Sequence, residues 1–231
     1  MSLQLAVEST SGLYSVAIGP VGTGTVGIGA GDGTVAHQAS RRDEPGFAGL
    51  GGLVDRALAE LGGAVADVSR LAVDIGPGNL SSVRAAAAYV NGLAFSLGLE
   101  IFCVSSLELL ATQYSQQGSL PVLCMRKASG GNAYLGLYRG AEPVWLAFGQ
   151  LGPTVVALCG SLPELAVAGG PADTVAKVLP ETHVADTGLA HPDIDVLYRL
   201  AVNPAGPRGT VVDMAHPLNE GSPEFHEQAR Q

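Results

Sequence analysis

The stretch LAVDIGPGNLSSVRAAAAYVNGLAFSLGLEIFCVSSLELL, residues 71–110, decides the fold of this chain. Its apolar start at 71–75 is typical of a buried strand. The glycine-proline-glycine sequence at 76–78 predicts a sharp turn, because glycine accepts positive φ and proline fixes φ near −65°. Apolar side chains then recur at steps of three and four over 80–98, which predicts a helix, and 101–104 predicts a second strand. A helix N-terminus at the tip of a strand is a place where an anion can bind.

The flanking sequence extends this strand–helix–strand unit into an α/β protein with a mixed sheet. A first hairpin is expected at 3–7 and 14–18, a third strand at 25–28, and a helix at 47–61 with an apolar stripe. We expect an N-terminal lobe over 1–115, a C-terminal lobe over 116–204, and a loop or partly disordered tail over 205–231. In the C-terminal lobe, strands are predicted at 121–125, 133–138, 144–148, 165–168 and 183–184, and helices at 154–158, 173–179 and 193–202.

Two segments carry a resemblance to a known family. GPGNLSSVRAAAAYVNGLAFSLGLEIFCVSSLELLA (76–111) resembles the GPGSFTGVR…GLA…GVSSL region of the TsaB (YeaZ) family, and LQLAVESTSGLYSVAIG (3–19) resembles its first hairpin. The resemblance covers roughly residues 3–115. It implies a two-lobed actin-like (ribonuclease H-like) α/β fold, with the second lobe shortened or degenerate. It also implies the function of that family, the non-catalytic partner in bacterial threonylcarbamoyladenosine synthesis on tRNA.

The chain departs from the family pattern in three places. Members typically carry DAR-x-GEVY at the start of the second lobe, whereas residues 127–134 read KASGGNAY, so that Lys127 stands in place of the acid. The His-Ser-Glu before the first long helix is absent, since 42–46 reads RDEPG. The EP-x-Y-x-R ending is missing, and 215–218 (AHPL) is its nearest counterpart. These departures indicate a divergent member or a paralogue.

Seven residues are candidates for binding a nucleotide or another anion. In actin-like ATPases an acid at the end of the first strand helps to hold metal and phosphate, and Glu8 occupies that place. The others lie beside it or around the glycine turn. The seven residues are Glu8, Ser9, Thr10, Gly76, Gly78, Ser81 and Arg84.

Each candidate also has a structural interpretation. Glu8 can hydrogen-bond the 9–11 turn, Asp74 can bond loop N–H groups or Arg84, and the glycine turn can simply pack a strand against a helix. No catalytic residue and no metal ligand is assigned. The five histidines stand apart, and neither a zinc motif, a Gly-x-Ser-x-Gly elbow nor a phosphate-binding Gly-x₄-Gly-Lys loop occurs.

Composition narrows the function classes. The formal net charge of −9, from 12 basic against 21 acidic residues, disfavours direct nucleic-acid binding, which depends on neutralising phosphates. No apolar run approaches the roughly 18 residues of a membrane span, and the N-terminus lacks the basic region of a signal peptide, so a cytoplasmic protein without membrane contact is expected. Three widely spaced cysteines are interpreted as buried free thiols.

Three functions compete. The first is a non-catalytic TsaB-like scaffold for the tRNA modification. The second is a divergent actin-like ATP-binding phosphotransferase, or an accessory subunit of a carbamoyltransferase outside tRNA modification. For this class ATP with magnesium is the cofactor considered, between the lobes in a complex. The third is a protease, which lacks nucleophile and metal motifs. The scaffold function needs no catalytic or metal-binding residues, whereas the other two functions do. We therefore expect a pseudo-enzyme with no certain cofactor.

The scaffold interpretation predicts association through the two long helices of the first lobe. Both helices are dense in glycine and alanine, and small side chains let helix backbones approach closely. In the family that the chain resembles, this helical face forms the homodimer and the complex with the TsaD-like catalytic partner. The expected interface residues are Leu50, Leu53, Ala57, Ala88 and Gly92.

Overall fold

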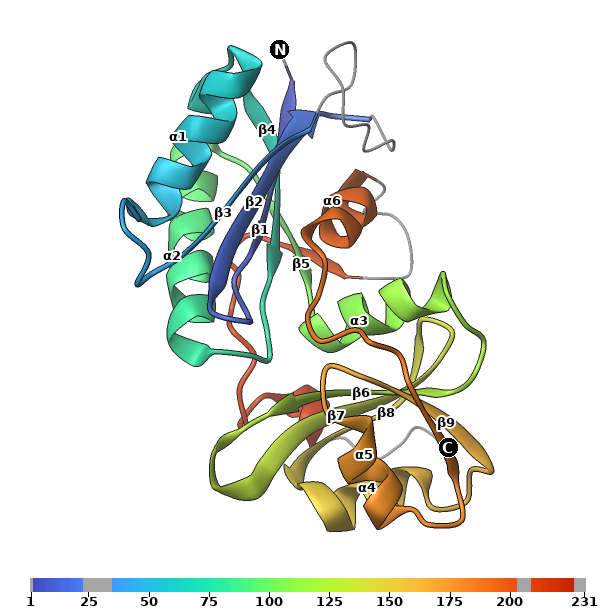
Figure 1. The fold of residues 1–231 in the computed structure, drawn as a ribbon. Helices are drawn as coiled ribbons and strands as arrows, with labels where there is room; N and C mark the ends of the chain where they lie inside the picture. Colours follow the sequence, from blue (N-terminus) through green and yellow to red (C-terminus); the bar gives the residue numbers. More distant parts are fainter. Residues whose placement is uncertain (1, 23–34, 203–208, 227–231) are drawn as a thin grey trace. The chain divides into compact units, whose positions relative to one another are not determined.

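The computed structural model of this protein describes residues 2–22, 35–202 and 209–226. Internal contacts divide the chain into two units. Unit 1 comprises Met1–Ser105 and Asp193–Pro217, and unit 2 comprises Ser106–Pro192 and Leu218–Gln231. Each unit has its own sheet, drawn in Figure 1. The two α/β lobes predicted from the sequence are confirmed.

The described part of unit 1 contains a six-stranded sheet in the order β11-β5-β4-β1-β2-β3. Strands β1, β4 and β5 are parallel, and β2, β3 and β11 run antiparallel to their neighbours. In the β1–β4 pair Val7 lies opposite Val73, which brings the C-terminal ends of these two strands to the same edge. The bounds are β1 Leu3–Glu8, β2 Leu13–Pro20, β3 Ala36–Arg41, β4 Val68–Asp74, β5 Ile101–Val104 and β11 Thr210–Val212.

Helices cover both faces of this sheet (Figure 1). Helices α1 (Gly49–Leu61) and α2 (Leu80–Leu97) pack on one face, where α1 contacts β2 and β3 and α2 contacts β4. Helix α6 (Ile194–Val202) packs on β1, β2 and β4 from the other side. The central strand β1 is buried along its whole length because it has a strand on either side and helices above and below.

Unit 2 contains a five-stranded sheet among its described residues, in the order β10-β9-β6-β7-β8. The β6-β7-β8 meander is antiparallel as predicted, and β9 and β10 continue the sheet parallel to β6. Helix α3 contacts β6, β7 and β9, while α4 contacts β7 and β8. The bounds are α3 Ser106–Ser115, β6 Val122–Lys127, β7 Asn132–Arg139, β8 Glu142–Gln150, α4 Leu151–Cys159, β9 Glu164–Ala168, α5 Ala172–Val178 and β10 His183–Asp186.

The last part of the chain differs from the loop expected from its composition. Strand β11 pairs with β5, and the segment at 218–226 packs on unit 2, where the ring of Phe225 lies 5.0 Å from that of Tyr134. The division also differs from the expected boundaries at 115 and 204, because α3 packs within unit 2 whereas α6 and β11 return to unit 1. The strand expected at 25–28 lies outside the described residues, and the described third strand, β3, was not predicted.

The three cysteines are buried and free, as predicted. Burial raises the pKa of the Cys103 and Cys159 thiols to about 12 and raises that of Cys124 further. A thiol in an apolar interior resists ionisation because the charged thiolate loses its hydration. Cys103 packs in the core of unit 1 and Cys159 in that of unit 2, so these side chains behave as small apolar residues.

Candidate functional site

The glycine turn after β4 is packed tightly against the tip of β1. A Cβ atom added to Gly78 would lie 2.5 Å from Thr10 Cβ and 2.6 Å from Thr10 O, and Gly76 has a φ of 92°. The Gly76–Pro77 peptide bond is cis. The backbone N–H of Asn79 donates to Thr10 O over 2.8 Å. The turn is therefore packed against the residues that follow β1, and Thr10 occupies the space next to Gly78.

Glu8 is a buried carboxylate at the end of β1 that bonds its own turn. Its Oε1 accepts a hydrogen bond of 2.6 Å from the backbone N–H of Thr10 and a second, short hydrogen bond from the Thr10 hydroxyl. Ser9, between them, is fully buried. These bonds direct one carboxylate oxygen into the protein backbone, which is the structural interpretation given to Glu8.

Asp74 repeats this arrangement one strand away. It is fully buried at the end of β4, and its Oδ1 accepts a hydrogen bond of 2.8 Å from the backbone N–H of Gly76. A buried carboxylate is stable when such N–H groups solvate it. Arg84 lies on the exposed side of α2 and forms no ion pair with any residue in the described ranges, so the proposed Asp74–Arg84 contact is not found.

Asn79 is the N-cap of α2. Its Oδ1 accepts hydrogen bonds from the Ser82 backbone N–H at 3.3 Å and from the Ser81 hydroxyl at 2.8 Å. The cap satisfies one of the N–H groups that a helix leaves without an internal partner. Of the seven residues proposed for anion binding, the structure brings Glu8, Ser9, Thr10, Gly76, Gly78 and Ser81 together around this turn, and it places Arg84 one turn further along α2.

Replacing Asn79 with alanine is expected to destabilise the protein by about 1 kcal/mol, because the first turn of α2 loses its cap. For a chain of this size that loss corresponds to a fall in Tm of roughly 2–4 °C, measurable by thermal denaturation. Asn79→Ser keeps an acceptor oxygen and should retain most of the stability. An alanine variant as stable as the wild type would show that the cap contributes nothing.

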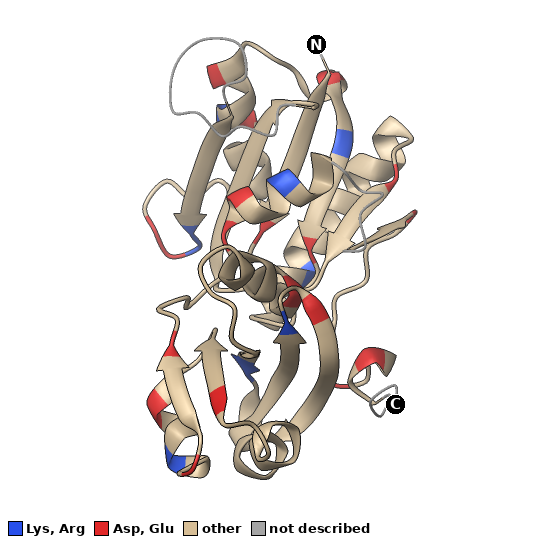
Figure 2. Ribbon diagram, turned by 90° about the vertical axis from the view of Figure 1, so that its right-hand side faces the viewer, with Lys and Arg blue, Asp and Glu red and all other residues tan. Residues whose placement is uncertain are grey.

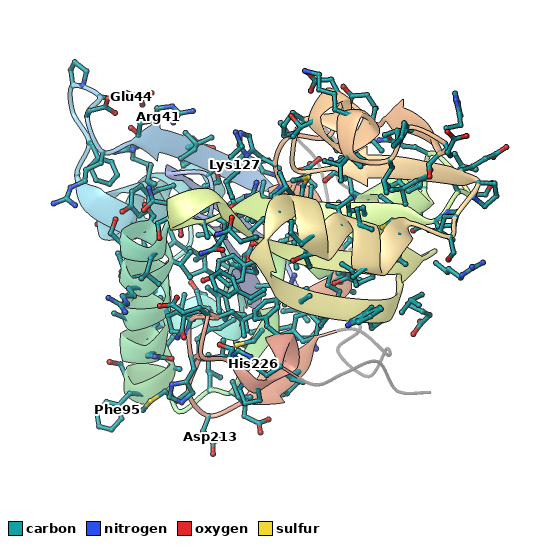
Figure 3. The ribbon with its side chains drawn as sticks, turned by 90° about the horizontal axis from the view of Figure 1, so that it is seen from below. Arg41, Glu44, Phe95, Lys127, Asp213 and His226 are labelled. Atoms are coloured by element: carbon teal, nitrogen blue, oxygen red, sulfur yellow. The ribbon has the colours of Figure 1, made fainter. Side chains whose placement is uncertain are left out.

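The outward face of α2 carries an exposed apolar stripe. Ala85, Ala88, Gly92 and Phe95 follow one another at steps of three and four, and all four are exposed. Phe95 is 92% exposed and projects away from the helix (Figure 3). A Cβ atom on Gly92 would meet nothing within 4 Å, so the absence of a side chain there serves no packing within the described structure. We call these four residues the α2 face.

The residues expected at an interface on α1 have a different environment. Leu50 is buried, and Leu53 and Ala57 are fully buried. All three pack in the core of unit 1 with the strands that α1 covers. These side chains therefore hold the helix to its own sheet, and of the five residues predicted for the interface only Ala88 and Gly92 lie on the surface.

Exposed apolar residues outside α2 were not predicted from the sequence. Asn91 exchanges two hydrogen bonds with the backbone of Ala215, at 2.8 and 3.1 Å, and thereby fixes the segment after β11 beside the helix. Met214 in that segment is 56% exposed, and Val211 of β11 is also exposed. Phe95 could have been found from the sequence, because it extends the helical spacing of the small residues at 88 and 92.

Other kinds of site find little support in the described ranges. They contain no group of three or more His, Cys, Asp or Glu side chains placed to hold a metal ion. None of the helices that the structure defines is long and apolar enough to cross a membrane. Figure 2 shows acidic residues on elements of both units and the fewer basic residues scattered among them.

Part of this chain is similar in sequence to tRNA N6-adenosine threonylcarbamoyltransferases. The family model of TsaD, tRNA N6-adenosine threonylcarbamoyltransferase, matches residues 47–150. A tRNA N6-adenosine threonylcarbamoyltransferase of Maricaulis maris is 38% identical over 93 residues, which cover 39% of this chain and 24% of that protein. The chain thus matches about a quarter of the length of this curated relative.

Two solved structures from Pseudomonas aeruginosa match along nearly the whole chain. YeaZ has a TM-score of 0.66 and 27% identity, with 95% of this chain and 100% of that chain covered. A protein described as similar to peptidase YEAZ has a TM-score of 0.68 and 25% identity, with 95% and 99% covered. The two sheets and these matches define a two-lobed protein of the actin-like class. These matches confirm the resemblance to the TsaB (YeaZ) family seen in the sequence.

Proposed function

We propose that this chain is a non-catalytic partner protein in the modification of an adenosine of tRNA to N6-threonylcarbamoyladenosine. It acts by pairing through the α2 face, either with a second copy of itself or with a threonylcarbamoyltransferase of the TsaD type. The observation that carries the proposal is the exposed apolar stripe ending at Phe95. An apolar patch that leaves an aromatic ring in water is typical of a protein–protein contact.

The hydrogen bonds of Glu8 and Asp74 support the proposal that this chain is a partner protein with no catalytic activity of its own. Glu8 and Asp74 are the buried carboxylates at the strand tips, and each bonds a backbone N–H two residues further on. The space beside Gly78, where a phosphate would have to approach the turn, is occupied by Thr10. An acid that solvates its own turn is a poor base or metal ligand, because reaction would break the bonds that hold the turn.

Charge supports contact with tRNA through a partner. The chain carries a net charge of −9, so its long-range field repels phosphate backbones. A catalytic relative would supply the nucleic-acid contact and the chemistry. The family that the chain resembles and the names of the relatives it matches favour the threonylcarbamoyl reaction over other uses of an actin-like fold.

Two measurements test the proposal: the mass of the purified chain in solution, and the threonylcarbamoyladenosine content of tRNA in cells that lack the chain. Light scattering of the purified chain should give about twice 23.4 kDa, or a stoichiometric complex when the threonylcarbamoyltransferase of the same organism is added. Depleting the chain in its own cell should lower the threonylcarbamoyladenosine content of tRNA, and the Phe95→Asp variant should fail to restore it.

Two results would overturn the proposal. One is a chain that stays monomeric at high concentration and binds no transferase. The other is steady ATP hydrolysis by the isolated chain that disappears in Glu8→Ala, which would favour the phosphotransferase interpretation. Normal tRNA modification after depletion would separate the chain from this pathway even if it dimerises.

A further inference from the structure

A cavity of about 360 Å³ lies in unit 2, at the edge of the sheet where its parallel strands end. Strand β6 ends at Lys127, β9 ends just before the glycine pair at 169–170, and β10 ends at Asp186. The wall is completed by the loop that follows β10. The lining residues are Lys127, Gly169, Gly170, Pro171, Asp186, Gly188, Leu189, Ala190 and His191.

The topology of the sheet favours a ligand at this edge. From β6 the chain passes to β7 and β8 on one side, and later to β9 and β10 on the other. The carboxyl ends of β6 and β9 therefore flank the point where the strand order reverses. In α/β sheets, ligands bind in the crevice at such a switch point.

A buried arginine holds two of the residues that line the cavity. Arg126 is only 6% exposed, and its Nη1 donates to Ala190 O over 3.0 Å and contacts His191 Nδ1 at 3.3 Å. A guanidinium only donates hydrogen bonds, so this contact requires Nδ1 to accept and places the proton of the neutral ring on Nε2. Arg126 thus fixes both the loop and the ring at the edge of the cavity.

The glycine pair forms a wall that is made of backbone. Gly169 has a φ of 78°, and a Cβ atom there would lie 2.4 Å from Met125 O. On Gly170 a Cβ atom would lie 2.5 Å from the Met125 side chain. Gly169 N–H donates to Leu189 O over 2.6 Å, which ties this wall to the loop after β10. The cavity is therefore a built feature of unit 2.

The lining of the cavity carries one lysine and one acid. The protein has only two lysines and a net charge of −9, yet one of the lysines lines the cavity beside a buried arginine. Lys127, labelled in Figure 3, is exposed, and no ion pair joins it to another of the residues described. The acid in the lining, Asp186, accepts the Gly188 N–H through its Oδ1 over 2.9 Å.

We propose that this cavity binds a small organic anion, with Lys127 as its charge partner. The glycines, Pro171 and Leu189 provide a surface for an apolar body, and Lys127 provides a donor for one phosphate or carboxylate group. An ammonium group can contact such an anion directly. The site lies in unit 2 and does not depend on association through the α2 face.

The test is a ligand titration of the uniformly ¹⁵N-labelled full chain, with the amide NMR spectrum recorded at each ligand concentration. Phenyl phosphate and benzoate are the probes, since they share an apolar ring and differ in the anionic group. At least one should shift the amides of Gly169, Gly170, Gly188 and Ala190 saturably, with a Kd on the order of 1 mM. Inorganic phosphate, which lacks the ring, should bind more weakly.

Matched variants decide whether Lys127 carries the binding. Lys127→Gln should weaken it by about tenfold, and Lys127→Arg should retain it. Lys177→Gln removes the other lysine, which lies on α5 outside the cavity, and should change nothing. Unaltered amide shifts elsewhere in the spectrum will show that each variant is folded. The proposal is overturned if neither probe shifts these amides saturably, if benzylamine binds as well as the anions, or if the two lysine-to-glutamine variants behave alike.

Discussion

The Phe95→Asp variant is expected to remain folded and to lose association by at least about 30-fold in Kd. An exposed phenylalanine contributes about 2 kcal/mol when a partner buries it, which corresponds to that factor. Because the ring is 92% exposed, its removal takes nothing from the core of unit 1. Aspartate adds the desolvation of a charge at the centre of the contact, so the loss should exceed that of Phe95→Ala.

Sedimentation velocity over a range of concentrations measures this effect, with circular dichroism as the check on folding. Val156→Asp is the matched control, since Val156 is another exposed apolar residue on a helix but lies on α4 of unit 2. Association that survives in Phe95→Asp would remove the α2 face from the interface. Substitutions at Leu53 are unsuitable for this purpose, because that side chain is fully buried and its loss would unfold the helix.

The sequence predicted the parts of the fold whose signals are local. Residues 71–104 have their strand, turn and helix signals in direct succession, and β4, α2 and β5 form where they were expected. The meander of unit 2 was likewise found from short apolar runs separated by turn residues. Each of these elements is specified by residues within a few positions of one another, so a single sequence is sufficient to find them.

Contacts between elements that lie far apart in the chain could not be predicted from the sequence. Strand β11 is only three residues long, too short to show a pattern, and it pairs with β5, over a hundred residues earlier. The return of α6 to unit 1 depends on contacts of the same kind, including the hydrogen bond of 3.1 Å from the Tyr198 hydroxyl to Pro20 O. Such contacts leave no periodicity in the sequence around them.

The candidate site shows the same limit. The candidates around the glycine turn were chosen from the sequence one by one, and the structure places most of them together because β1 and β4 are parallel and end at one edge. The sequence left open whether they bind a ligand or form the turn, and only the structure shows Thr10 packed against Gly78. On α1 the apolar stripe could not distinguish a core face from an interface, since both bury the same residue types.

Gly78→Ala is expected to destabilise the protein by about 3 kcal/mol, which lowers Tm by roughly 6–12 °C. The added methyl group would lie within 2.8 Å of Thr10 Cα, Cβ and O. Thr10 cannot move aside easily, because its N–H donates to Glu8 and its carbonyl accepts from Asn79. Relief of the clash must therefore break one of these bonds or separate β1 from the start of α2.

Thermal and urea denaturation would measure the loss, with Gly152→Ala as the control. A Cβ atom on Gly152 meets nothing within 4 Å, and the residue lies in α4, where alanine is the better helix former. The control should therefore be as stable as the wild type or slightly more stable. A Gly78→Ala protein of wild-type stability would mean that the turn has room to spare, and the space beside Gly78 would again be a candidate site for an anion.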